Sequence, residues 1–256
     1  MRWGVKDENT DDHKTWDACK VELDRCIVES CETFFISLQG CKYGYRPLPR
    51  EIEQVRFDDH IHNKYTGSDR DELVALAKKW YVLDTNSVPM RYVLTRLDVT
   101  NRDEYWSDVL TKLLKLLNGL MFDEDLYIGD SVTNWEAVYA LNKNSSTNDR
   151  VVWMKREIVD GITDADDPLK EFDDARGNAD VTDRLRKLVD TMSDKLGGVS
   201  SHVHTTTIDS VLSIKNKPNS AFTSYIEEFY TKMKSLLTSE VNRDIHLLLY
   251  ILFINC

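Results

Sequence analysis

The sequence lacks the short motifs by which the commonest enzyme classes are recognised. It contains no glycine-rich phosphate-binding loop, no G-x-S-x-G nucleophile turn and no H-E-x-x-H zinc motif. Each motif combines a special backbone turn or a fixed ligand spacing with a reacting group, so its absence removes that class, although not every enzyme. The sequence therefore predicts no catalytic residue and no cofactor-binding residue.

Long apolar runs and an excess of basic residues are also missing. The apolar run Leu247–Ile254 is far shorter than the roughly 20 residues that a membrane-spanning helix needs. The formal net charge is −11, and the lysines and arginines are scattered along the chain. The short apolar run means that we expect no membrane span. Because polyanion-binding proteins usually present a basic face, we also expect no general binding of nucleic acid.

Cysteine is scarce and irregularly spaced. The five cysteines are odd in number, no C-x-x-C occurs, and their spacing fits no common zinc pattern. The first dozen residues are acidic and lack the apolar run of a signal peptide. We therefore expect reduced, buried cysteines in a cytoplasmic or otherwise intracellular protein.

The sequence does contain apolar residues at helical spacing. In the clearest stretch, residues 222–237, apolar positions recur at steps of three and four while glutamates and lysines fill the other side. Such steps place side chains on one face of a helix but on both faces of a strand. The pattern predicts an all-α fold, an irregular multi-helix bundle of about nine or ten helices with little or no sheet.

Several boundaries follow from the same pattern. The first helix is expected from Asp12 or His13 to Gln39, with Gly40 as its stop. For residues 88–99 the pattern allows strand or helix, and we favour helix because no partner strand is evident nearby; residues 151–159 are expected to be helical or mixed. Further helices are expected over residues 68–83, 101–118, 131–141 and 181–196.

The expected domain organisation is simple. Residues 1–12 are predicted to form a flexible, acidic N-terminus, and residues 13–256 a single helical domain. The polar stretch 142–149 is the place where a subdomain boundary would fall.

Asp58, Asp59 and His62 are the candidate metal ligands. Carboxylate oxygen and imidazole nitrogen bind divalent metals, and Asp58 and His62 share a helix face because they are four residues apart. A solvated polar turn near a helix end explains the same residues, since charged clusters usually face water.

Two other groups have a chemical and a structural interpretation. The hydroxyl-rich stretch His202–Thr207 could position a phosphate, or form the N-cap region of a following helix. The pairs Glu29 with Glu32 and Asp69 with Glu72 could bind magnesium across two helices. In a chain with 44 acidic residues, two such pairs are also expected by chance.

The apolar run at the C-terminal end is the strongest indication of a partner. Eight consecutive apolar residues cannot all lie on one side of a helix, so such a helix is central in the core or meets another molecule. The candidate partner-binding residues are Leu248, Tyr250 and Phe253.

The sequence therefore predicts a non-enzymatic helical interaction or structural protein. It would self-associate as a homo-oligomer, or bind a protein partner, through helical faces. The alternative is a metal-dependent phosphoester hydrolase that uses Asp58, Asp59 and His62 on helices. A divalent metal is predicted only under that alternative, and no other cofactor is expected.

Overall fold

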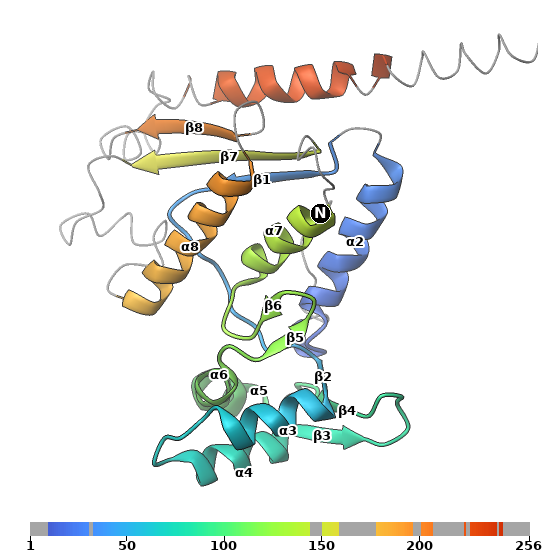
Figure 1. Cartoon of the computed structure of the whole chain (residues 1–256), viewed down its shortest axis with the longest axis vertical. Coiled ribbons are helices and arrows are strands. Elements are labelled where there is room, and N and C mark those ends of the chain that lie inside the picture. The colour runs from blue at the N-terminus through green and yellow to red at the C-terminus, as the bar shows by residue number, and fades with distance from the viewer. Residues whose placement is uncertain are drawn as a thin grey trace, which may run out of the picture. The chain divides into compact units, whose positions relative to one another are not determined.

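The computed structural model describes residues 10–30, 33–143, 150–158, 178–196, 201–206, 223, 226–239 and 241–242. The chain divides into two compact units, labelled by element in Figure 1. Unit 1 consists of Met1–Glu22 and Gly44–Tyr139, and unit 2 of Leu23–Tyr43 and Ala140–Cys256. The chain therefore leaves unit 2 after Tyr43 and returns to it at Ala140.

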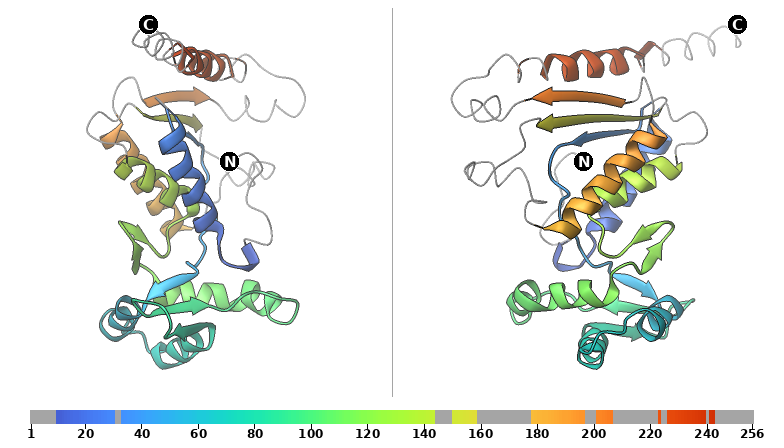
Figure 2. Two further views of the ribbon diagram at one scale, coloured as in Figure 1. Left: turned by 90° about the vertical axis from the view of Figure 1, so that its right-hand side faces the viewer. Right: turned by 60° about the vertical axis from the view of Figure 1, so that its left-hand side comes forward.

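Unit 2 contains a parallel three-stranded sheet in the order β1-β7-β8 (Figures 1 and 2). The strands are β1 (Phe35–Gln39), β7 (Val151–Ile158) and β8 (Ser201–Thr206). Phe35 pairs with Val151 and Trp153 pairs with Ser201. All four residues from Val151 to Met154 are buried, which is typical of a central parallel strand covered on both faces.

The edge strand β1 alternates in an unusual sense. Ser37 and Gln39 are buried, whereas Ile36 and Leu38 are exposed. Gln39 is tolerated inside because its side-chain amide donates to the carbonyl oxygens of Gly40 and Lys42, at 3.2 and 3.1 Å. β1 therefore turns its polar positions inward and its apolar positions outward.

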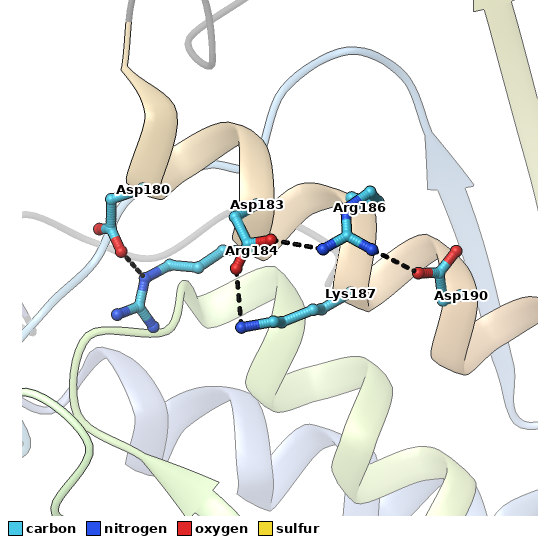
Figure 3. A network of polar contacts seen from close by, with 6 residues as sticks. All are labelled: Asp180, Asp183, Arg184, Arg186, Lys187 and Asp190. Carbon is cyan, nitrogen blue, oxygen red and sulfur yellow. Dashed lines mark hydrogen bonds and ion pairs between the residues drawn. The ribbon is translucent and has the colours of Figure 1, made fainter.

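Helix α8 (Ala179–Lys195) joins β7 to β8 in sequence and is fixed at its start and along its surface. The side chain of Asn178 accepts a hydrogen bond from the Val181 amide at 3.2 Å, which satisfies one free donor of the first turn. Val181, Leu188 and Met192 are buried. The outer side carries the ion-pair network of Figure 3, which joins Asp180 to Arg184, Asp183 to Arg186 and Lys187, and Arg186 to Asp190.

Two helices contribute residues to both units. They are α2 (Thr15–Glu29) and α7 (Val132–Lys143). Within unit 1, Trp16 of α2 contacts Trp135 and Tyr139 of α7 edge to face, with ring centroids 6.0 and 5.6 Å apart. Such aromatic contacts stabilise a core beyond the area that they bury.

Unit 1 combines helices with two antiparallel sheets. One sheet has the order β2-β4-β3, and the other is the hairpin β5-β6. The strands are β2 (Glu51–Glu53), β3 (Tyr81–Asp84), β4 (Arg91–Leu94), β5 (Met121–Asp123) and β6 (Leu126–Tyr127). The helices are α3 (Gln54–Asn63), α4 (Arg70–Trp80), α5 (Arg102–Glu104), the π-helical η1 (Tyr105–Val109) and α6 (Leu110–Leu117).

The core of unit 1 is rich in buried aromatic rings. Phe57, Trp80, Tyr81 and Tyr105 are each at most 3% exposed. Tyr81 donates its hydroxyl hydrogen bond to the carbonyl oxygen of Pro49 at 2.7 Å, so its polar end is satisfied inside the core. This bond fixes the segment that leads into β2.

The all-α prediction is wrong, because the described residues include three sheets. The expected first helix ends at Glu29, and residues 35–39 form β1. Residues 91–94 form β4, whose partners are β2 and β3, and residues 151–158 and 201–206 form β7 and β8. Over described residues 15–195 the α-helices are the seven from α2 to α8, fewer than the nine or ten expected.

The physical reason differs from strand to strand. β7 is a short, continuous apolar run, which periodicity cannot distinguish from a buried helix. β4 pairs with β2, which lies far away in sequence, and with β3, which has only four residues. Neither partner strand can be recognised from the residues around β4. Parallel strands pair across long connections, and nothing in their own residues identifies the partner.

His60 gives the fold a defined pH dependence. Its ring is buried, and Nε2 lies 3.1 Å from the carbonyl oxygen of Leu116, so Nε2 carries the proton because a carbonyl can only accept. Nδ1 has no partner among the described residues. Burial lowers the pKa of His60 below its ordinary value.

We expect His60→Gln to weaken the acid sensitivity of folding. Because the pKa of His60 is lower in the folded protein than in the unfolded chain, the unfolded chain binds more protons as pH falls. The contribution of neutral His60 to the free energy of unfolding is therefore fully present above about pH 6.5 and is lost as pH falls through the folded pKa. The melting temperature of the variant should fall less between pH 7.5 and pH 5 than that of the parent chain. The exposed His62→Gln is the control, and an unchanged pH dependence in His60→Gln would contradict this assignment.

Candidate protein-interaction surfaces

The predicted metal ligands lie on α3 and make separate contacts. Asp58 accepts a hydrogen bond from the Tyr92 hydroxyl at 3.3 Å, and Asp59 accepts one from the side chain of Asn63. His62 is exposed. In the part of the chain that the structure describes, no three histidine, cysteine or acidic side chains are grouped so that they could hold a metal ion. Metal binding by Asp58, Asp59 and His62 therefore stays a prediction.

The predicted partner-binding residues Leu248, Tyr250 and Phe253 lie outside the described residues. The stretch expected to form an N-cap region, residues 202–206, instead belongs to strand β8. None of the described helices is long and apolar enough to cross a membrane.

Unit 1 contains a cleft of about 380 Å³ that the sequence did not indicate. It lies among α2, the segment from Pro49 through β2, the first turn of α3, and strand β5. Five acidic and four basic side chains line it, together with Trp16, Pro49 and Phe122. The cleft is therefore strongly polar, with charges of both signs.

Most of these charges are already paired. Lys20 Nζ lies 2.6 Å from Asp123 Oδ2, and Arg91 Nη1 lies 3.1 Å from Glu51 Oε2. Arg56 contacts Glu53 at 3.2 Å and also donates to the main-chain carbonyl of Met121 at 3.2 Å. The ion pairs join α2 to β5, β4 to β2, and α3 to the end of β2, so they hold the walls of the cleft.

Asp17 is a partly buried acid of the cleft. Burial and then the nearby Glu51 carboxylate raise the pKa of Asp17, while Arg50 and two lysines act in the opposite direction. Neither Asp17 nor Arg50 is part of an ion pair among the described residues. Arg50 and two lysines already lie near Asp17, and Glu51 is paired with Arg91, so this end of the cleft holds charges of both signs.

Asp123 shows the opposite balance. Burial raises the pKa of Asp123, but hydrogen bonds from Lys20, the Glu124 amide and Trp16 outweigh it and leave the pKa below its ordinary value. Asp123 is therefore held ionised against Lys20.

A second surface lies in unit 2, on the helical residues 226–239 and the helical pair 241–242 that follows. Ile226, Tyr230, Leu237 and Val241 recur at helical spacing and are 47%, 63%, 66% and 56% exposed. With the half-buried Met233 they form one stripe, which we call the apolar stripe. An apolar groove of about 440 Å³ runs along it between residues 230 and 242.

The sequence predicted the helical spacing of this segment but placed no site there. Its other apolar positions, Phe229 and Leu236, are half-buried. The two sets lie on neighbouring sides of the helix, because a residue step of 100° separates them. Exposure depends on what the fold places opposite each side, and periodicity carries no information on that.

Comparison with known proteins finds similarity over part of the chain. No family model matches it, and no solved structure matches it significantly. It is 33% identical over 94 residues to NACHT domain- and WD repeat-containing protein 1 of Mus musculus, which covers 37% of this chain and 6% of that protein. The human protein of that name is 26% identical over 170 residues, or 62% of this chain and 10% of that protein.

A second protein type gives the same result. NACHT and WD repeat domain-containing protein 2 of Homo sapiens is 29% identical over 94 residues, which is 37% of this chain and 5% of that protein. The chain is similar to part of NACHT and WD repeat proteins. It spans no more than 10% of the length of these relatives.

Replacing Asp123 by Asn should destabilise unit 1 by about 1 kcal/mol at pH 7, because a partly buried ion pair loses one charge. A carboxyl group whose pKa is depressed by folding stabilises the folded protein above about pH 3.9, and this stabilisation is lost as pH falls through the folded pKa. Urea denaturation should therefore show a difference from the parent chain that narrows at pH 3. The exposed Glu72→Gln is the control, and an equal effect of both variants at pH 7 would disprove the role given to Asp123.

Proposed function

We propose that the chain is a non-enzymatic protein-interaction module that self-associates, or binds a protein partner, through the apolar stripe of residues 226–241. The observation that carries this proposal is the exposure of Tyr230, Leu237 and Val241, which recur at helical spacing over the helical residues 226–239 and 241–242. Aligned exposed apolar side chains of this kind mark interaction sites in soluble proteins. An isolated exposed apolar residue would not.

Helix pairing is the mode that fits this surface. Apolar side chains at steps of three and four enter a complementary groove or helix, and association removes their area from water at about 25 cal/mol per Å². Thr238 and Lys234 border the apolar stripe and remain able to contact water at its rim. An apolar centre with a polar border is the usual arrangement of such interfaces.

The comparisons support the class of function. The relatives are named for a NACHT domain and WD repeats, and the chain is similar to a small part of them. We infer that the chain makes contacts with other protein domains, either in a second copy or in a partner. The WD-repeat region of the human relative is the first partner to test.

The test compares two variants that add the same charge on different sides of the helix. Leu237→Glu places it in the apolar stripe, and Ser235→Glu places it on the exposed polar side. A buried unpaired carboxylate at an interface costs several kcal/mol, so Leu237→Glu should weaken association at least tenfold and Ser235→Glu should not. Concentration-dependent light scattering reports self-association, and calorimetry with the purified WD-repeat region reports partner binding.

A parent chain that is monomeric and does not bind the WD-repeat region contradicts this proposal. Association that is equally weakened by both substitutions contradicts the assignment of the apolar stripe, because added charge alone would then explain the effect.

A further inference from the structure

The apolar stripe has the spacing of a seam between two helices. Within the helical residues 226–239, drawn in orange-red in Figure 1, the positions Ile226, Tyr230, Met233 and Leu237 follow one another at steps of four, three and four. These are the a and d positions of a heptad repeat, along which two helices pack side by side. The first, second and fourth of them are exposed. The seam is therefore open to a second helix.

One flank of this seam carries two charges of opposite sign. Glu227 and Lys234 occupy the e positions that border it, one in each half of the helix, and both are exposed. Neither belongs to an ion pair among the described residues. The other flank, formed by Phe229 and Leu236 at the g positions, is apolar and half-buried. In this helix, charge therefore borders the seam on the Glu227 side.

The two charges distinguish between the orientations that a second copy of this helix can take. In a parallel pair, each e position faces a g position of the other helix, which would set Glu227 and Lys234 against the apolar flank. In an antiparallel pair about a two-fold axis, the e positions face each other instead. Glu227 then lies opposite Lys234 of the second copy, offset by about 3 Å along the helix axis, which these long side chains can span.

We propose that the apolar stripe binds a second copy of this chain, with the two helices antiparallel about a two-fold axis and Glu227 of each copy paired with Lys234 of the other. Opposite charges then meet twice in each dimer, which fixes the orientation of the pair more than it adds to its affinity. This pairing rests on the function proposed above, since it names the partner of the same surface.

The antiparallel arrangement also closes the seam. Ile226 meets Leu237 of the second copy, and Tyr230 meets Met233, because the members of each pair are equally far from the centre of the seam. The apolar groove of about 440 Å³ between residues 230 and 242 receives the N-terminal half of the second helix. A two-fold contact requires a surface that is complementary to itself, and this helix meets that requirement in both its apolar and its charged positions.

The experiment exchanges the two charges in the full chain and measures dimerisation by sedimentation velocity. Glu227→Lys places two lysine pairs in each dimer, and Lys234→Glu places two glutamate pairs, so each variant alone should dimerise about tenfold more weakly than the parent chain. An equimolar mixture of the two variants restores opposite charges at both contacts. The mixed dimer, followed by energy transfer between labels on the two N-terminal amines, should form as tightly as the parent dimer.

The control carries the same changes of net charge on the exposed polar side of the helix. One control variant combines Thr231→Lys with Ser235→Lys, and the other combines Thr231→Glu with Ser235→Glu. Their mixture measures the general attraction between oppositely charged chains, which salt screens. At physiological salt, mixing the control variants should tighten dimerisation by less than about twofold.

A test mixture that does not recover, while Leu237→Glu still weakens dimerisation, would overturn the antiparallel pairing and leave the apolar stripe as the interface. The pairing is equally contradicted if the control mixture gains as much as the test mixture. A parent chain that stays monomeric but binds the WD-repeat region through Leu237 would exclude the second copy as the occupant, although the proposed function would stand. A parent chain that neither dimerises nor binds that region would overturn both.

Discussion

The parallel pairing of β1 with β7 is the constraint on which the described architecture depends. It places Phe35 beside Val151, although the larger segment of unit 1, Gly44–Tyr139, lies between them in sequence. The entropic cost of closing a connection grows only slowly with its length, so a folded insertion is tolerated provided that its ends can meet the sheet. The buried run from Val151 to Met154 supplies the apolar area that compensates for this closure.

Helices with a clear polar side could be predicted from the sequence. The expected helices over residues 68–83, 101–118, 131–141 and 181–196 correspond to α4, to α5 through α6, to α7 and to α8. Their apolar positions recur at helical steps because one side meets the core, as Leu113 and Leu117 do in α6. The strands could not be predicted in this way. β1 alternates over only five residues, and Phe34 and Leu38 also fit helical spacing, whereas β7 is apolar on both faces and shows no alternation.

The candidate surfaces, like the strands, could be predicted only in part from the sequence. The helical spacing of residues 226–237 was evident from the sequence, but the exposure of Tyr230 and Leu237 was not. The cleft of unit 1 joins residues from α2, β2 and β5, and the contact of Lys20 with Asp123 spans most of that unit. The residues of such a site are far apart in sequence, so no local sequence pattern predicts it. The chemistry of Asp58, Asp59 and His62 singles out this stretch in the sequence, whereas the structure shows that His60, between them, is the buried histidine.

Native-state hydrogen exchange tests the β1–β7 pairing most directly. As denaturant is added, the amides of residues 35–39 that donate to β7 should lose protection together with those amides of residues 151–154 that donate to β1, with one common opening free energy. That result follows because neither strand can open its shared ladder without the other. Fast exchange throughout residues 35–39 while the amides of residues 151–154 that donate to β1 stay protected would contradict the pairing, and with it the insertion of Gly44–Tyr139 between these two strands.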